Sequence, residues 1–408
     1  MSKVCIIGLG YIGLPTATLL AERGFKVVGV DINPKVVEKI NRGEIHIHEP
    51  DLDVAVTSAV KTGNFTASLK PAPADVFILA VPTPFKEDRT PDISYIESAV
   101  IAIAPYLQPG NLVILESTSP VGTTEKISYW LKELRPDMSA EFPIYIAHCP
   151  ERVLPGKILK ELINNDRIIG GINEYSAQQA AIFYKKFVNG NLVCTDARTA
   201  ELAKLAENAF RDVNIAFANE LSMICDRLGI NVWELIDLAN RHPRVNILQP
   251  GPGVGGHCIA VDPWFIVDSA PEQARLIRTA REVNDYKPRH LLEKIREKAS
   301  QIKEPAIACL GLAYKADIDD LRESPAVWIV QELAKSFAGK ILVAEPYIKD
   351  LPKSLADMSV TLTTFESAIA EANIVVLLVN HTQFLNHPQK ILDGKIVIDA
   401  RGVWRSKS

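Results

Sequence analysis

The chain has 408 residues, of which 47% are hydrophobic and 23% are charged, and its formal net charge is −4 at pH 7. Domains usually contain roughly 100–200 residues, so this length predicts a globular protein with two or three of them. The nearly balanced charge excludes the basic surface of a general nucleic-acid binder or of a protein held on an anionic membrane. An anionic small molecule would therefore have to be bound by a local group of Arg and Lys side chains.

The six cysteines form no Cys-x-x-Cys pair and no Cys/His group with the spacing of a zinc site. The chain opens on a strand pattern rather than a signal peptide, and no apolar run approaches the roughly 20 residues of a membrane-spanning helix. We therefore expect no metal, free thiols and a cytoplasmic location. The cysteines are Cys5, Cys149, Cys194, Cys225, Cys258 and Cys309.

The N-terminal segment follows the order strand, glycine turn, helix, strand, acid. A predicted strand at 3–7 precedes Gly8-Leu-Gly-Tyr-Ile-Gly13, a predicted helix covers 14–23, and a strand at 25–30 ends at Asp31. The glycines allow a tight turn close to a pyrophosphate, which the helix N-terminus receives, and the acid accepts from a ribose 2′-hydroxyl. An acid here would repel a 2′-phosphate, so the pattern predicts NAD rather than NADP. The alternative is a glycine-rich turn that binds nothing.

Three more buried strands are predicted at 75–80, 112–115 and 144–147, each followed by a polar loop that contains proline. Ligands of doubly wound sheets bind outside the carboxyl ends of the strands. Each polar residue of these loops, taken alone, is equally well an ordinary loop residue. Those placed to meet a cofactor or substrate are Thr83, Thr118, Glu151 and Arg152.

A helix predicted at 199–228 has no Pro or Gly and exceeds the roughly 8–20 residues of typical helices, so we expect it to connect two domains. Lys204, Asn208 and Arg211 share one face of it, because they are spaced at i, i+4 and i+7. Such a stripe is either a solvated surface or one wall of a polar site. Further helices are predicted at 231–238 with Asn231 as the N-cap, at 276–286 and at 289–298.

The stretch Gly251–Pro263 combines four glycines with Cys258 and Asp262. Glycine lets the backbone approach a ligand, and a thiol placed beside backbone N–H groups can attack a carbonyl whose oxyanion those groups stabilise. The alternative is a tight turn with a buried, inert cysteine. The preceding basic loop offers His242 and Arg244 to an anion.

A second Rossmann-like run begins near residue 304, with strands predicted at 306–310, 341–344, 373–379 and 396–399. It lacks the glycine fingerprint, so we expect it to hold an anionic nucleotide through side chains such as Lys315, Arg322 and Arg401. The alternative is a degenerate duplicate with a packing role only. The predicted fold is α/β, with two Rossmann-like doubly wound domains joined by a long central helix and a helical region. The expected boundaries are 1–198 for the NAD-binding domain, 199–300 for the central helical domain and 301–408 for the second Rossmann-like domain.

Five stretches together resemble the UDP-glucose/GDP-mannose dehydrogenase family over essentially the whole chain: 8–15, 116–122, 149–153, 253–258 and 320–325. Longer runs resemble most closely the members that oxidise UDP-N-acetyl-D-mannosamine; they lie at 41–47, 211–219, 240–251 and 257–264. The resemblance implies a four-electron oxidation of the sugar C6 alcohol to a carboxylate, with two NAD and one water. It also implies a homodimer or larger assembly with the long helix at the interface.

The resemblance also implies roles for individual residues. Cys258 would add to the aldehyde as a thiolate and be oxidised to a thioester, with Lys204 supplying charge or moving protons and Asn208 donating to the oxyanion. Asp262 would orient water or act as a base, and Thr118 and Glu151 match positions near the nicotinamide and the water. The implied NAD contacts are Gly8, Gly10, Tyr11, Ile12, Gly13, Asp31, Thr83, Thr118 and Arg322. The implied UDP-sugar contacts are Arg152, Val153, Lys204, Asn208, Arg211, His242, Arg244, Gly255, Tyr314, Lys315 and Arg401.

At one position the chain departs from the family pattern, since Arg401 stands where a lysine is expected. Arg is a planar fork and Lys a point donor, so the charge is kept but the contact geometry differs. Arg244 is expected to reach the site of a neighbouring subunit.

Three other functions remain open: the same oxidation of UDP-glucose, UDP-N-acetylglucosamine or GDP-mannose, a non-catalytic nucleotide-sugar binder, and a two-electron dehydrogenase of the 2-hydroxy-acid type. Retention of Cys258, Lys204 and Asp262 together argues against the binder, which needs no nucleophile.

Overall fold

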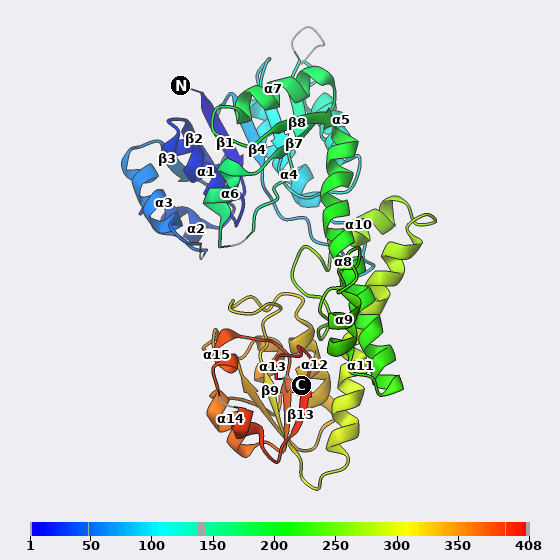
Figure 1. The fold of residues 1–408 in the computed structure, drawn as a ribbon. Helices are drawn as coiled ribbons and strands as arrows, with labels where there is room; N and C mark the ends of the chain where they lie inside the picture. The colour runs from blue at the N-terminus through cyan, green and yellow to red at the C-terminus, as the bar shows by residue number, and fades with distance from the viewer. Residues whose placement is uncertain (1, 48, 138–142, 155, 388, 405–408) are drawn as a thin grey trace. The chain divides into compact units, whose positions relative to one another are not determined.

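The computed structural model describes residues 2–47, 49–137, 143–154, 156–387 and 389–404 (Figure 1). The chain folds into two compact units, Met1–Glu207 and Asn208–Ser408, and each has its own β-sheet. The helix α8 (Ala197–Leu228, 32 residues) begins in the first unit and ends in the second.

The sheet of the first unit has eight strands in the order β3-β2-β1-β4-β5-β6-β7-β8. The strands from β3 to β6 are parallel, whereas β7 pairs antiparallel to β6 and β8 pairs parallel to β7. The strands are β1 (Lys3–Ile7), β2 (Lys26–Val30), β3 (Phe65–Ser68), β4 (Val76–Leu79), β5 (Leu112–Leu115), β6 (Tyr145–His148), β7 (Arg167–Gly171) and β8 (Leu192–Asp196).

Both faces of this sheet are covered, as expected for continuous apolar strands. Alternate residues of β1 show this: Val4 and Ile6 pack into a core shared with α1, α3, α6 and α7, while Cys5 and Ile7 pack into a core shared with α4 and α5. The helices are α1 (Gly13–Glu22), α2 (Pro34–Asn41), α3 (Leu52–Lys61), α4 (Ser94–Ile103), the 3₁₀ turn η1 (Ala104–Tyr106), α5 (Thr123–Leu134), α6 (Ile158–Asn164) and α7 (Glu174–Tyr184).

The second unit contains a helical part and a five-stranded parallel sheet of order β11-β10-β9-β12-β13. Residues of α11 and α12 pack on one face of the sheet, and α14 packs on the other. The strands are β9 (Ala306–Leu310), β10 (Lys340–Ala344), β11 (Val360–Leu362), β12 (Ile374–Leu377) and β13 (Ile396–Asp399). The further helices are α9 (Val232–Ala239), α10 (Asp262–Ser269), α11 (Arg275–Ala299), α12 (Pro325–Ser336), α13 (Lys353–Ala356), α14 (Phe365–Glu371), α15 (Thr382–Leu385) and η2 (Gln389–Leu392).

The predicted fold class is confirmed, and the strands predicted from the sequence agree with the structure within two residues at each end. Asn231 caps α9 as predicted, since its Oδ1 accepts from the backbone N–H groups of Trp233 and Glu234. The prediction of two helices at 276–286 and 289–298 is wrong, because α11 is one helix that continues through Pro288. Proline removes one backbone hydrogen bond, but Pro288 is buried together with Lys287 before it and Leu291 after it, so packing holds the helix on both sides.

Candidate active site

Two glycines of the first turn are required by the protein's own backbone. Gly8 has φ of +95°, and a Cβ built on it would lie 2.4 Å from the Ala80 carbonyl oxygen. A Cβ on Gly13 would lie 1.8 Å from the carbonyl oxygen of Gly8. Any side chain at either position would displace the turn between β1 and α1.

The remaining features of the turn fit a dinucleotide. A Cβ on Gly10 would meet no atom within 4 Å, and the N-terminus of α1 has no side-chain cap at Ile12, which leaves it open to a pyrophosphate. The carboxylate of Asp31 is fixed at the end of β2 by the backbone N–H groups of Leu9 (3.2 Å) and Asn33 (2.9 Å). An open glycine, an uncapped helix N-terminus and a fixed acid are the parts that NAD needs.

The loops after β4 and β5 are tied to each other by hydroxyl groups. The Thr83 hydroxyl donates to the Thr118 carbonyl oxygen at 2.6 Å, and the buried Ser117 hydroxyl donates to the Val81 carbonyl oxygen at 2.7 Å. The structure therefore brings Thr83 and Thr118 together at the carboxyl edge of the sheet, where cofactors bind in this class of fold.

A buried network of two carboxylates and one guanidinium lies at the same edge. Arg167 donates to Glu151 at 2.6 Å and has its other terminal nitrogen 3.9 Å from Glu116. Tyr184 donates its hydroxyl hydrogen to Glu116 at 2.7 Å. Burial raises the pKa of Glu116 from 4.5 to about 7, although the nearby Arg167 favours the charged form. The network therefore joins the predicted site residue Glu151 to a second carboxyl group of unusual proton affinity.

No role was predicted for Glu116 and Arg167 from the sequence. Glu116 stands inside a stretch that resembles the family, and Arg167 opens the apolar run of β7. A charged residue at the start of a buried strand is a signal that it has a buried partner, and this signal would have found Arg167.

The loop after β6 carries the predicted site residues Arg152 and Val153. The Arg152 guanidinium donates to Glu207 at 2.7 Å and to the Asp166 carbonyl oxygen at 2.5 Å, while Val153 packs partly buried against the core. Lys204 is partly exposed on α8. Its charge is one of the causes that lower the pKa of His148, the last residue of β6. The pKa of His148 falls to about 3, chiefly through burial.

In the second unit, three predicted catalytic residues come together. Asp262 is buried at the first turn of α10 and accepts a hydrogen bond from the Asn208 side-chain amide at 2.6 Å. The Asp262 backbone N–H donates to the Cys258 carbonyl oxygen at 2.8 Å, so the cysteine lies one turn before the carboxylate. Cys258 is only partly buried, which argues against the inert, buried cysteine of the alternative interpretation.

The glycine stretch needs its glycines because Tyr314 packs against them. A Cβ on Gly255 would lie 2.8 Å from the Tyr314 Cβ, and one on Gly256 would lie 2.9 Å from the tyrosine ring. Gly256 has φ of +82°, and its N–H donates to the Arg322 carbonyl oxygen at 3.0 Å. The segment that contains Tyr314 and Arg322 therefore fixes the backbone that leads into Cys258.

The remaining predicted residues of the second unit are spread over several loops. Arg401 donates to the Asn380 side-chain oxygen at 3.0 Å and approaches Gly251, and burial lowers the pKa of its guanidinium. Arg322 forms an ion pair with Asp320. Arg211, His242, Arg244 and Lys315 are exposed.

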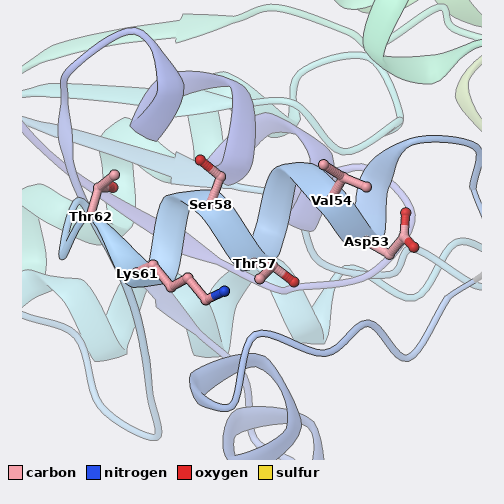
Figure 2. Close-up of a pocket in the computed structure, with 6 residues that line it drawn as sticks. All are labelled: Asp53, Val54, Thr57, Ser58, Lys61 and Thr62. Atoms are coloured by element: carbon pink, nitrogen blue, oxygen red, sulfur yellow. The ribbon is translucent and has the colours of Figure 1, made fainter.

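A hollow on the first unit includes none of these residues in its lining. Its volume is about 440 Å³, and Figure 2 shows its lining side chains along the single helix α3. The lining consists of short or exposed side chains of one helix with no predicted site residue among them, so it is not the candidate site. The lining residues are Asp53, Val54, Thr57, Ser58, Lys61 and Thr62.

Two absences hold for the part of the chain that the structure describes. None of its helices combines the length and apolar character needed to cross a membrane. Within the same residues, His, Cys, Asp and Glu side chains form no group of three or more that could hold a metal ion.

Three family models match consecutive parts of the chain. They are the NAD-binding domain (residues 2–188), the central domain (198–286) and the UDP-binding domain (308–406) of the UDP-glucose/GDP-mannose dehydrogenase family. These matches cover most of the chain.

Similar proteins extend over the whole length. An NDP-N-acetyl-D-galactosaminuronic acid dehydrogenase of Ralstonia nicotianae is 60% identical over 99% of this chain and 96% of its own. A UDP-N-acetyl-D-mannosamine dehydrogenase of Campylobacter jejuni is 59% identical over 94% of this chain and 96% of its own. The solved UDP-D-ManNAc dehydrogenase of Pyrococcus horikoshii is 40% identical, with a TM-score of 0.89 over 99% of this chain and 96% of its own. The chain therefore belongs to the UDP-glucose/GDP-mannose dehydrogenase family, an enzyme family whose cofactor in the N-terminal domain is NAD.

Proposed function

We propose that the protein oxidises UDP-N-acetyl-D-mannosamine at C6 to UDP-N-acetyl-D-mannosaminuronate, through a covalent intermediate on Cys258. The observation that carries this proposal is the arrangement around that thiol. Cys258 is partly exposed after a run of required glycines, and it lies one turn before a buried carboxylate that Asn208 contacts. A pure binding protein has no use for a nucleophile in such a setting.

The two oxidations remove four electrons from C6. Bound NAD supplies the hydride acceptor for each oxidation. Deprotonation of the C6 hydroxyl accompanies the first hydride loss, and either the Asp262 carboxylate or the Lys204 amine accepts that proton. Cys258 then adds as a thiolate to the aldehyde carbon, and Asn208 donates to the resulting oxyanion of the thiohemiacetal. Loss of the second hydride and of the hydroxyl proton leaves a thioester on Cys258.

Hydrolysis of the thioester completes the reaction. Water adds to the thioester carbon, the C–S bond breaks, and the carboxylate leaves as the thiol of Cys258 is restored. We assign the orientation of that water to Glu151, whose carboxylate is held at 2.6 Å by Arg167, with Thr118 nearby at the carboxyl edge of the sheet. Two NAD and one water are consumed for each sugar, and two NADH are formed.

The choice of sugar is supported by the similar proteins rather than by contacts in the structure. Relatives named for N-acetyl-D-mannosamine occur among both the similar sequences and the similar structures. The 60% identity to the Ralstonia protein favours a second candidate, the same oxidation of a nucleotide-linked N-acetyl-D-galactosamine. The two sugars differ in configuration at C2 and C4, so a substrate panel separates them.

The experiment measures NADH formed per sugar consumed. The panel contains UDP-linked N-acetylmannosamine, N-acetylgalactosamine, N-acetylglucosamine and glucose, and GDP-mannose. We expect two NADH per UDP-N-acetylmannosamine and the highest kcat/KM with that sugar. A yield of one NADH would refute the four-electron reaction, and turnover of another sugar alone would refute the substrate. In a second arm, Cys258→Ser should abolish acid formation while the affinity for NAD is unchanged; full activity would refute the covalent step.

We also propose that the chain forms a homodimer through α8. Phe210, Phe217 and Ile224 are spaced by seven residues and are 70%, 51% and 47% exposed, and Leu228 adds 64% one turn later. A heptad-spaced apolar stripe of this kind fits against a second copy of the same helix. In sedimentation velocity experiments, Phe217→Asp should produce monomers, whereas Glu220→Asp on the same helix should leave the dimer intact. A Phe217→Asp protein that remains dimeric would exclude this interface.

The assignment of domains and compartment follows the same reasoning. We infer an NAD-binding domain to residue 198, a central domain to 300 and a UDP-sugar-binding domain beyond it. We place the protein in the cytoplasm, since Cys5, Cys149, Cys194, Cys225 and Cys309 are free thiols, and a reducing compartment preserves such groups.

A further inference from the structure

The turn that follows β9 in the second sheet resembles the turn that follows β1 in the first. The acidic residue beside it has a different role. Gly311 has φ of +92° and Gly8 has φ of +95°, and the N–H of each donates at 2.8 Å to the last residue of the neighbouring strand. Glu345 follows β10 as Asp31 follows β2. Glu345 therefore occupies the position at which a dinucleotide fold places the acid that binds a ribose.

Both carboxylate oxygens of Glu345 form hydrogen bonds within the protein. Its Oε2 accepts from the backbone N–H groups of Leu312 (2.7 Å) and Ala313 (3.0 Å), and it lies 3.0 Å from Nε2 of His381. Its Oε1 accepts from the Tyr347 N–H at 3.1 Å. The side chains of Glu345 and His381 have no exposed surface. A ribose diol therefore cannot reach this carboxylate, and the role of Glu345 is structural.

His381 connects Glu345 to Asp317, which lies further along the loop that follows β9. Its Nδ1 accepts from the Asp317 backbone N–H at 2.9 Å, so the ring proton is on Nε2 and is donated to Glu345. The Asp317 carboxylate in turn accepts from the Thr382 N–H (2.8 Å) and hydroxyl (2.6 Å). Asp317 has φ of +61°, in the left-handed region that Asp adopts more readily than most other non-glycine residues, and these hydrogen bonds hold it there.

We propose that Glu345 and His381 form a clamp that positions Tyr314 and Lys315 to bind the UDP part of the nucleotide sugar. The clamp fixes residues 312, 313 and 317, and thereby both ends of the short segment that carries those two side chains. This inference rests on the proposed function, whose substrate carries UDP, and on the family resemblance, which implies that Tyr314 and Lys315 contact the UDP-sugar.

The clamp matters because Lys315 is exposed and carries its charge on a flexible side chain. A lysine on a mobile loop loses conformational freedom when it binds a phosphate, and a backbone fixed in advance reduces that cost. Tyr314 has a second constraint, since its ring contacts Gly255 and Gly256, so a loose loop would also disturb the glycine stretch. In this proposal Glu345 and His381 do not contact the UDP-sugar themselves, and they act as positioning residues.

The test is equilibrium binding of UDP to the full-length protein by calorimetry. His381→Ala removes both hydrogen bonds of the ring, and Glu345→Gln replaces the carboxylate by a neutral amide whose NH₂ group would oppose the Tyr347 N–H, so we expect the Kd for UDP to rise about tenfold. The affinity for NAD should be unchanged, because the NAD turn lies in the other unit. His381→Asn keeps an acceptor for the Asp317 N–H and should recover part of the loss, which a merely destabilised domain would not show.

A less buried His–Glu pair in the same unit provides the matched control, with side chains that are 29% and 64% exposed. His387 lies 3.6 Å from Glu366, so His387→Asn and Glu366→Gln make the same chemical changes away from the segment. Neither should change the Kd for UDP.

A double-mutant cycle separates positioning from general instability. If the clamp acts through Lys315, His381→Asn should weaken UDP binding in the parent but have little effect in a Lys315→Ala background. Equal effects in both backgrounds would overturn the inference, as would unchanged UDP binding in both His381→Ala and Glu345→Gln. If Lys315→Ala itself leaves UDP binding unchanged, the substrate assignment of the proposed function is what fails.

Discussion

Replacing Glu116 by Gln tests the buried charge network of the first unit. The network contains two carboxylates, Glu116 and Glu151, for the single guanidinium of Arg167, so it is one negative charge in excess when both acids are ionised. Gln has the shape of Glu, and its amide oxygen can still accept the hydrogen bond from Tyr184. The variant therefore removes the excess charge without opening a cavity.

The expected effect depends on pH with a definite sign. Burial raises the pKa of Glu116 from 4.5 to about 7, so between these values the folded chain holds a proton that the unfolded chain releases. The free energy of unfolding that this group contributes is greatest below pH 4.5 and is lost as pH rises through 7. At about 1.4 kcal/mol per pH unit, the loss amounts to roughly 3 kcal/mol. Glu116→Gln has no such proton, so its stability should change less between pH 5 and 8.

Urea unfolding at pH 5, 6, 7 and 8 measures this difference. We expect the midpoint of the parent to fall more steeply with pH than that of Glu116→Gln, with the variant relatively more stable at pH 8. Glu125→Gln is the control, because Glu125 pairs with Arg198 at 3.0 Å and both side chains are more than half exposed. That variant should keep the slope of the parent. Parallel curves for the parent and Glu116→Gln would refute the reasoning.

Two further substitutions test the turns at the candidate site. Gly256→Ala should strongly reduce kcat for acid formation, because the glycine has φ of +82° and the new methyl group would lie 2.9 Å from the Tyr314 ring; wild-type steady-state kinetics would contradict this. Asp31→Ser should raise KM for NAD by about tenfold or more, because it removes the ribose acceptor and the carboxylate bond to the Leu9 N–H, while the Kd for UDP is unchanged. An unaltered KM for NAD in that variant would show that the acid does not meet the ribose.

The parts of the fold that the sequence predicts well are those with strong local signals. The strands buried on both faces, such as β4, β5 and β12, are unbroken apolar runs, and the glycines and Asp31 set the first turn. The strands at Phe65–Ser68 and Leu192–Asp196 were not predicted, because neither is an unbroken apolar run: Thr66 interrupts the first with an exposed side chain, and the second has no buried residue. Pro288 misled the prediction of α11, since burial around a proline outweighs its local preference.

The candidate site, like the fold, could be predicted from the sequence only in part. The sequence indicates that Cys258, Asn208 and Asp262 share a function, but only the structure shows the 2.6 Å bond between the amide and the carboxylate. Arg167 lies 51 residues beyond Glu116 along the chain, and its position between two acids is set by the pairing of β7 with β6. No periodicity or spacing in the sequence reports such a contact, because it depends on which strands become neighbours.

The reversed direction of β7 and β8 has a consequence for where the chain leaves the first unit. Only the last two residues of β7 pair with the last two of β6, so the reversed strands start beyond the carboxyl end of β6 and finish level with it. The helix α8 therefore begins beside the edge that carries the polar loops, and Glu201 near its start accepts from the backbone N–H groups of Gly122 and Thr124 after β5. A deletion of this strand pair would keep the glycine turn after β1 intact, but it would leave Lys204 without the anchor that holds the start of its helix at that edge.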